Sequence, residues 1–382
     1  MKRGDSPPAI RPRGAATLVD GASIGRRDGG RQSSGQQYDG RPYDGGRAGD
    51  QPAGDRRAFL AVAAGAAGAL LGARPLASMA QTGAAYPNRP VRLLIPFAAG
   101  SGTDIGGRLI AEELGKVIGQ NVIVENRPGA SAQIAAEMAA KAPPDGYTLF
   151  LTTNTSHSAN PFLFKKLPYD PVKDFAPIAR TYFLPFVLVV DGKLPVHSVA
   201  ELVAYVKANP DKASYGYGNS TGQVAGASFK QALKLPLTAV PYKSTPPAIA
   251  DIIGGSITFM FVDLPAARES LRAGRLRAIA VTTAKRSTLM PEVPAAGETP
   301  GLEGFDLTSW GGIFAPAGTP PEIVTRLSEA VRGVLGRKEV AERFAGMSYE
   351  LAPSSPSELA AFVTDQLDSW GKKVREAGIQ PE

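Results

Sequence analysis

The chain has 382 residues, no cysteine, a formal net charge of +7 and 43% hydrophobic residues. The lack of cysteine excludes disulfides, thiol nucleophiles and cysteine-ligated metals. Residues 1–80 hold 12 Lys+Arg against 7 Asp+Glu, so only about +2 of the charge lies beyond them, and nucleic acid is not an expected partner. About 300 residues remain after this segment, which is enough for two domains.

The first 80 residues are predicted to lie outside the fold. Residues 1–54 are rich in Gly, Arg, Asp, Gln and Ser, which predicts a disordered extension, or else a true start codon further on. Residues 55–80 combine Arg56-Arg57, a short Ala/Gly/Leu run and a small-residue site at Ala77–Ala80. This pattern is typical of a twin-arginine export signal and predicts a periplasmic protein. The alternative is a basic tail beside an internal core helix.

From Tyr86 onward, predicted strands alternate with predicted helices. The strands are 91–95, 122–126, 147–152, 213–217, 238–241, 257–262, 276–283 and 309–315, and the helices are 103–118, 131–142, 198–209, 222–235, 247–253, 265–273, 320–335, 338–345 and 355–377. Residues 153–160 are expected to form a polar loop. The apolar run 175–190 is expected to cross into a second domain, and 276–283 is a candidate for the return.

This alternation predicts an α/β protein with parallel, doubly wound sheets. One lobe is expected to comprise 85–180 plus 305–382 and the other 181–304, with two extended crossings between them. Small ligands bind at domain junctions, outside the carboxyl ends of strands. We therefore expect a ligand cleft between the two lobes.

Three loops after strand ends are candidates for binding an anion. In the first, 97–104, Thr103 or Asp104 is a candidate helix N-cap, and a helix N-terminus presents unpaired N–H groups to an anion. The loops 152–160 and 218–223 are also rich in Gly, Ser, Thr or Asn. The alternative is ordinary cap and turn chemistry, which uses the same residues.

Three further residues are candidates for the site, and two of them have an alternative role. His157 lies in the second loop and is expected to line the cleft, Asp263 is either a helix cap or a ligand-contacting acid, and Trp310 either walls the cleft or packs in the core. The expected ligand-binding residues are Phe97, Ala98, Ala99, Gly100, Ser101, Gly102, Thr103, Asp104, Thr152, Asn154, Ser156, His157, Ser220, Thr221, Gly222, Gln223, Asp263 and Trp310.

Two motifs in the sequence resemble those of enzymes and offer alternatives to a binding function. Gly100-x-Gly102-x-x-x-Gly106, with Glu125 about twenty residues on, imitates a dinucleotide site, so an exported NADP-dependent oxidoreductase is an alternative. Gly218-x-Ser220-x-Gly222 imitates a nucleophile elbow, but both histidines precede it, so a histidine-based triad in that order is excluded. Two isolated histidines give no convincing metal site.

The ordered motifs resemble a known family over about 85–380. The family is the extracytoplasmic solute receptors of tripartite tricarboxylate transporters, called Bug or TctC-like receptors. The motifs are Tyr86-Pro87-x-Arg89-Pro90-Val91, Pro96-Phe97-Ala98-Ala99-Gly100-x-x-x-Asp104, Val124–Ala130, Pro144–Leu149, Leu167–Phe175, Val240–Lys243 and Phe314–Pro320.

The resemblance implies a type II periplasmic-binding-protein fold closing on a small organic acid. It implies a non-enzymatic receptor without a cofactor, a monomer that delivers its ligand to membrane permease subunits; a ligand-sensing partner of a membrane kinase would share the fold. It places Ala98–Asp104, Thr152–His157 and Ser220–Gln223 at the ligand. The third loop lacks the histidine many members carry, and Val262-Asp263 replaces a common Asp-Asn, so the ligand's identity stays open.

Overall fold

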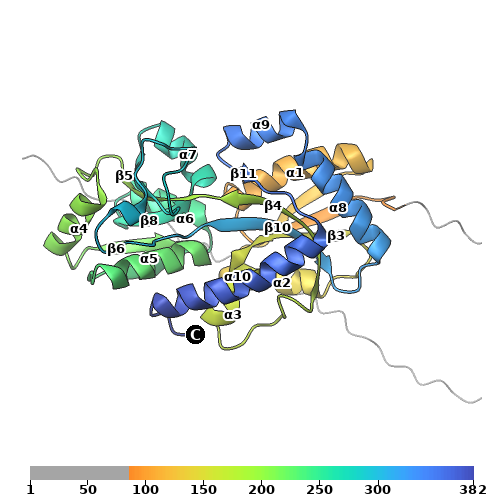
Figure 1. Cartoon of the computed structure of the whole chain (residues 1–382), viewed down its shortest axis with the longest axis horizontal. Helices are drawn as coiled ribbons and strands as arrows, with labels where there is room; N and C mark the ends of the chain where they lie inside the picture. The colour runs from red at the N-terminus through yellow and green to blue at the C-terminus, as the bar shows by residue number, and fades with distance from the viewer. Residues whose placement is uncertain (1–85) are drawn as a thin grey trace, which may run out of the picture. The chain divides into compact units, whose positions relative to one another are not determined.

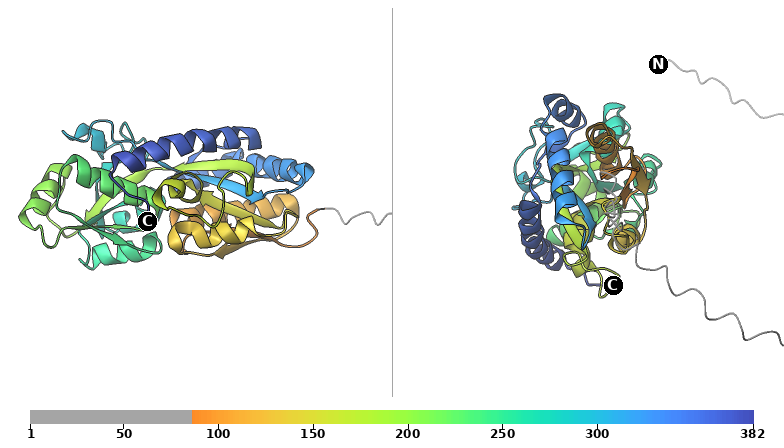
Figure 2. Two further views of the ribbon diagram at one scale, coloured as in Figure 1. Left: turned by 90° about the horizontal axis from the view of Figure 1, so that it is seen from below. Right: turned by 90° about the vertical axis from the view of Figure 1, so that its right-hand side faces the viewer.

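The computed structural model describes residues 86–382. The predicted disordered extension 1–54 and signal segment 55–80 lie outside these residues. Within 86–382 the chain forms two separate β-sheets with helices packed around them (Figures 1 and 2). No helix of this described part is both long and apolar enough to cross a membrane.

The first sheet has the strand order β11-β4-β10-β3-β1-β2. Its strands are β1 (Val91–Ile95), β2 (Val122–Asn126), β3 (Thr148–Thr153), β4 (Phe175–Leu184), β10 (Ser309–Pro316) and β11 (Glu350–Leu351). The helices that accompany it are α1 (Gly102–Ile118), α2 (Gln133–Ala140), α3 (Asn160–Leu163), α8 (Pro321–Leu335), α9 (Lys338–Gly346) and α10 (Pro356–Glu376), with short turns at Ala130–Ala132 and Thr155–Ala159. This part, 86–184 plus 309–382, is called lobe 1 below.

The second sheet has the order β7-β6-β8-β5-β9. It contains β5 (Phe186–Asp191), β6 (Ser214–Tyr217), β7 (Thr238–Pro241), β8 (Phe259–Asp263) and β9 (Leu276–Val281), with helices α4 (Val199–Ala208), α5 (Ser220–Ala232), α6 (Thr245–Ile253) and α7 (Leu264–Arg272). Residues 186–281 are called lobe 2 below. A short 3₁₀ turn, Ala296–Glu298, lies on the way back to lobe 1.

Two connections join the lobes. Pro185 alone separates β4 from β5, and residues 282–308 lead from β9 back to β10. The predicted boundary at 180 therefore cuts through β4. The expectation that 276–283 returns to the first domain is wrong, because β9 pairs with β5 in the second sheet. The return strand is β10, which lies between β3 and β4.

The two sheets are mixed rather than parallel. β1, β2 and β3 run parallel, as do β6, β7 and β8, in agreement with the predicted alternation. β10 is antiparallel to both neighbours, and so is β5. The prediction of parallel sheets fails there because both strands enter from the other lobe, and a crossing strand is not bound by the βαβ geometry.

Local sequence explains why α1 starts where it does. Ser101 has extended backbone angles and its Oγ accepts the N–H of Asp104, so Ser101 is the N-cap instead of the predicted Thr103 or Asp104. Gly119 ends the helix in the left-handed conformation, with φ of 73°. Leu109, Leu114 and Ile118 form its buried face, as their spacing predicts. The helix is thus fixed with its N-terminus at the end of β1.

The segment Thr153–Asn160 is not an exposed polar loop. β3 runs through Thr153, one turn of π-helix follows over Thr155–Ala159, and every residue of the segment is buried. Its polar groups bond to one another: Thr152 to Ser156, and Ser156 to His157 Nδ1. This internal pairing offsets part of the cost of burying the segment, although His157 Nε2, Ser158 Oγ and Asn160 Oδ1 have no hydrogen-bond partner among the described residues.

Candidate functional site

The N-termini of four helices, one from lobe 1 and three from lobe 2, lie around one cavity. Ser101 and Thr103 of α1, Asn219 at the cap of α5, Thr245 of α6 and Asp263 at the cap of α7 all line one cavity. Thr153 and Ser309 add hydroxyl groups from the strand ends. Helix N-termini carry positive partial charge and free N–H groups, so their convergence makes a site for an anion without any side-chain cation.

This inner cavity is small as the lobes stand here. Its volume of about 10 Å³ leaves room for roughly one water molecule. Direct hydrogen bonds hold the lobes together around it: Ala98 N donates to Ser244 Oγ at 3.1 Å, and Ser220 Oγ donates to Thr155 Oγ1 at 2.9 Å. A ligand carboxylate can therefore enter only if the lobes part or if a group inside moves.

Asn154 is the centre of the contact between the lobes. Its side chain is fully buried, and its Nδ2 donates to Ser220 Oγ at 3.3 Å and to Thr221 Oγ1 at 3.0 Å across the junction. Its Oδ1 accepts from Ser309 within lobe 1. The predicted site residues Asn154, Ser220 and Thr221 are thus brought together, although in this conformation they bond to one another.

Asp104 already has partners within lobe 1. Its carboxylate accepts the N–H of Gly100 at 2.9 Å and Asn126 Nδ2 at 2.8 Å, and it pairs with Arg108. Asn126 also donates to the carbonyl of Phe97. Asp104 therefore stabilises the first loop, and Arg108 compensates its charge. The Asp104 carboxylate does not occupy the backbone N–H groups at the start of α1, which can bind a different carboxylate.

Asp263 is the N-cap of α7, which is one of the two roles expected from the sequence. Its Oδ1 accepts the N–H of Ala266 at 3.1 Å at the start of α7, and its side chain is 4% exposed. The carboxylate also reaches across to the start of α1, where a Cβ built on Gly102 would lie 2.1 Å from Oδ1. Burial raises the pKa of Asp263 to about 6, against hydrogen bonds from Gly102 and Thr245 that lower it.

A larger pocket adjoins the inner cavity. Its volume is about 240 Å³, and it shares Phe97 and Asn219 with that cavity. The other lining residues are Ala130, Ser131, Ala132, Gln133, Leu163, Phe164, Tyr217, Gly218, Gln223, Pro241, Tyr242, Lys243 and Glu382. Phe97 and Gln223 were predicted site residues and Gly218 lies in a predicted loop, whereas the segment 130–133, Tyr217 and the segment 241–243 were missed.

The segment Ala130–Ala132 has an unusual backbone. All three residues have positive φ, of 44°, 47° and 73°, just before α2 begins. Non-glycine residues held in this region are strained and cluster at functional sites. The sequence did carry a signal, because this segment follows the end of β2 and the carboxyl ends of parallel strands meet at one edge.

Several predicted residues lie away from both cavities. His157 is fully buried among aromatic rings, 4.0 Å between centroids from Phe314, and desolvation lowers its pKa to about 3. Thr152 and Ser156 bond to each other beside it. Gly222 donates its N–H to Asn219 within lobe 2, and Ala99 and Gly100 are exposed at the rim. His157 therefore packs in the core instead of lining the cleft.

Trp310 also belongs to the core. It is 1% exposed and meets Phe362 edge to face at 5.4 Å. We expect Trp310→Phe to lower stability by about 1–2 kcal/mol through lost packing, with ligand affinity unchanged within about twofold. Thermal unfolding and calorimetric titration measure the two effects. A loss of affinity of more than about tenfold in a stably folded variant would show that Trp310 belongs to the binding site.

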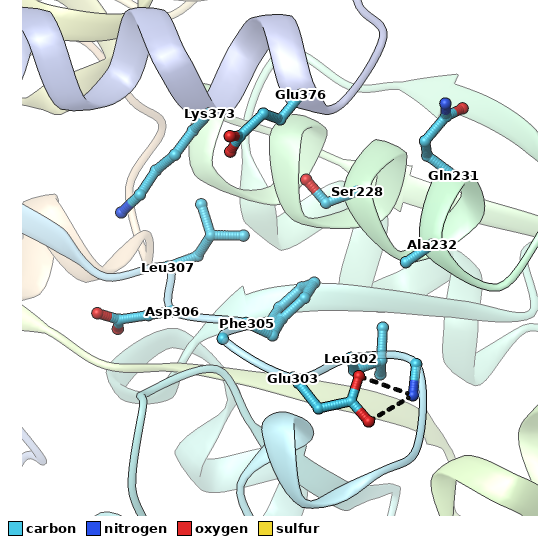
Figure 3. Close-up of a pocket in the computed structure, with 12 residues that line it drawn as sticks. Ser228, Gln231, Ala232, Leu302, Glu303, Phe305, Asp306, Leu307, Lys373 and Glu376 are labelled. Carbon is cyan, nitrogen blue, oxygen red and sulfur yellow. Dashed lines mark hydrogen bonds between the residues drawn. The ribbon is translucent and has the colours of Figure 1, made fainter.

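The pocket in Figure 3 is roomier but has the wrong charge for an anion. It measures about 310 Å³ and lies beside the C-terminal ends of α5 and α10 and the segment 301–307. Helix C-termini carry negative partial charge. The charged lining residues are Lys373, Glu303, Asp306 and Glu376. The four helix starts therefore suit an anion better than this pocket does.

The residues that imitated enzyme motifs have structural roles. A Cβ on Gly106 would lie 2.9 Å from the ring of Tyr182, so this glycine serves close packing and not a phosphate. Glu125 pairs with Arg92 at 3.2 Å. Ser220 bonds to Thr155 and Asn154, with no histidine beside it. Within 86–382 no three His, Asp or Glu side chains are grouped to hold a metal.

Solved structures of known proteins are similar to this chain along most of its length. A protein of R. palustris solved with adipate is 36% identical, with a TM-score of 0.75, covering 78% of this chain and all of that one. MatC of Rhodopseudomonas palustris with bound malate is 32% identical, with a TM-score of 0.72, covering 76% and 100%. The periplasmic binding protein BugD is 32% identical, with a TM-score of 0.74, covering 78% and 100%.

These comparisons confirm the predicted two-lobed periplasmic-binding-protein fold. The family described as "Tripartite tricarboxylate transporter family receptor" matches residues 107–379, which confirms the resemblance inferred from the motifs. Solute-binding receptors of this kind are not enzymes, so the oxidoreductase alternative is set aside. The chain belongs to the receptor family of the tripartite tricarboxylate transporters.

Proposed function

We propose that this protein is a periplasmic receptor that captures a small organic carboxylate between its lobes. The observation that carries the proposal is the meeting of four helix N-termini, from both lobes, at one hydroxyl-lined cavity. The adipate and malate bound by two similar structures are small dicarboxylates, which supports the same ligand class here.

The ligand would occupy the two adjoining cavities together. One carboxylate would meet the amides at the start of α1 in the inner cavity, and the remaining carbon chain would extend into the 240 Å³ pocket. Lys243, a cation in the lining of that pocket, is exposed at its edge. Hydroxyl and amide donors left unpaired by a wrong ligand would supply selectivity.

Capture would require a hinge motion at Pro185 and residues 282–308, the two connections between the lobes. The hydrogen bonds of Asn154 and Thr155 to lobe 2 must break for the ligand to enter and would form again around it. The ligand would shift the open and closed populations by its differential affinity for the two forms.

Delivery of the ligand to the membrane subunits of a tripartite permease is also proposed. It is supported by the family to which the chain belongs. A monomeric receptor exported through the twin-arginine segment 55–80 would meet such a permease in the periplasm. Pull-down of the permease subunits with the ligand-loaded receptor tests this step, and recovery of a membrane kinase instead would favour the sensing alternative.

A thermal-shift screen of mono-, di- and tricarboxylates tests the ligand class. At a hundred times its Kd, a true ligand should add about 2.7 kcal/mol to stability. With an unfolding entropy of about 2.1 cal/mol/K per residue over about 300 residues, that raises the Tm by roughly 4 °C. The matched control for each acid is its neutral diamide, which should give no shift. Shifts by the diamides as large as by the acids would contradict an anion site.

A further inference from the structure

A carboxylate of the protein itself already sits at the anion site of α1. Asp263 belongs to lobe 2, yet its Oδ1 lies so close to Gly102 of lobe 1 that a single added methyl carbon would approach it to 2.1 Å. Gly102 is the first residue of α1, directly after the N-cap Ser101. The side chain that closes the lobes here is therefore chemically the same as the group that the site is proposed to bind.

This carboxylate has no cationic partner among the described residues. The ion pairs within 86–382 do not include Asp263. Its Oδ1 accepts the N–H of Ala266, and the other groups that lower its pKa, the backbone of Gly102 and the side chain of Thr245, are also neutral. The titratable groups that face it are Asp104 of α1, which is paired with Arg108, Tyr182 of β4 and Tyr349 before β11. None of these groups offers Asp263 a positive charge.

The cavity cannot hold two ionised carboxylates. It has room for about one water molecule beside Asp263. A second negative charge at this distance disfavours ionisation of one of the two acids, as in any pair of carboxylates that share a site. Asp263 is the acid that becomes protonated, because burial already disfavours its charged form and raises its pKa to about 6.

Resting on the proposed function, we propose that the ligand carboxylate displaces the Asp263 carboxylate from the start of α1, and that Asp263 takes up one proton from the solvent as it does so. The ligand accepts the Gly102 N–H in its place. The protonated Asp263 keeps an oxygen for the N–H of Ala266, so α7 stays capped, and its new O–H can donate to the ligand or to Thr245. Asp263 thus makes ligand affinity dependent on pH. Because every ligand must also displace this carboxylate, a solute that interacts weakly with the site is not captured.

The sign of the pH dependence follows from this exchange. Binding raises the pKa of Asp263 further, so the complex holds a proton that the free protein has lost above pH about 6. Affinity should therefore rise as pH falls from 8.5 to 6.5, by up to about tenfold per pH unit. The ligand's own carboxylates stay ionised over this range, so the change belongs to the protein.

Calorimetric titration of adipate and malate into the wild type and Asp263→Asn tests the proposal. Asn is as good an N-cap as Asp, so the fold should be kept, which thermal unfolding checks. At pH 7.5 the variant should bind roughly 30-fold more tightly, since it need not protonate a group with a pKa of about 6. Titration in two buffers of different ionisation enthalpy should show uptake of one proton by the wild type and none by the variant.

Asp191→Asn is the matched control, because it removes the same charge from the last residue of β5, where Asp191 accepts the N–H of Lys193. It should behave like the wild type. Weaker binding by Asp263→Asn, or a wild type that binds without proton uptake, would overturn the proposal and make Asp263 a direct ligand contact or a plain cap. Failure of both proteins to bind any acid of the thermal-shift screen at any pH would instead overturn the carboxylate receptor itself, and this inference with it.

Discussion

Gly102→Ala should abolish most of the ligand affinity while leaving the fold intact. The space in front of Gly102 is filled by a carboxylate oxygen, that of Asp263 in this conformation and that of the ligand in the proposed complex. A methyl group at 2.1 Å from that oxygen leaves no room for either. We expect Kd to rise at least a hundredfold, or about 2.7 kcal/mol, measured by calorimetric titration of the best acid from the screen.

The clash of Gly102→Ala is mainly with the other lobe, and Leu184 of β4 is the nearest group of lobe 1, at 3.4 Å. Unfolding should therefore change little. Gly333→Ala in α8 is the matched control, because no atom lies within 4 Å of the added carbon. That variant should gain a few tenths of a kcal/mol to about 1 kcal/mol of stability and bind normally. Normal affinity in Gly102→Ala would remove the start of α1 from the site.

Asn154→Ala should release the ligand much faster than the wild type. The fully buried amide bonds to Ser220, Thr221 and Ser309, so its removal takes the central contact between the lobes and leaves buried hydroxyls unpaired. Each such group costs about 1–3 kcal/mol. Because a ligand leaves only when the lobes part, we expect the dissociation rate constant to rise roughly 30- to 100-fold, with a smaller change in association.

Stopped-flow displacement measures this rate. Asn209→Ala is the matched control: it removes an amide of the same size that donates to the carbonyl of Tyr205 within α4, away from the junction. Its dissociation rate should equal that of the wild type. An Asn154→Ala protein that is equally stable and releases ligand at the wild-type rate would show that the contact between the lobes plays no part in retention.

The sequence was most informative where the chain alternates regularly. The apolar run at Val91–Ile95, the small-residue loop after it and the helical spacing to Ile118 predict one βα unit, and the structure contains it. This unit is predictable because local periodicity and caps fix it without reference to distant residues. In the structure its loop meets Asp263 at Gly102, and Asn154 bonds separately to Ser220 across the lobes.

Long-range pairing was predicted less well. The strands β5 and β10 run against their neighbours, and β9 stays in lobe 2, because a strand crossing between lobes is placed by its partners and not by its own sequence. His157 and Trp310 carry polar groups yet pack in the core. Conversely, Ala130–Ala132 has no polar side-chain pattern that would mark a pocket wall, and its role depends on backbone conformation.

A crystal structure with adipate or malate bound is the most direct test of whether the helix N-termini bind the ligand carboxylate. We expect one ligand carboxylate within about 2.7–3.2 Å of the backbone nitrogen of Gly102, with the rest of the molecule in the pocket lined by Phe97 and Ala130–Gln133. A ligand held in the pocket of Figure 3, or anywhere else while the Asp263 carboxylate still occupies the start of α1, would contradict the account.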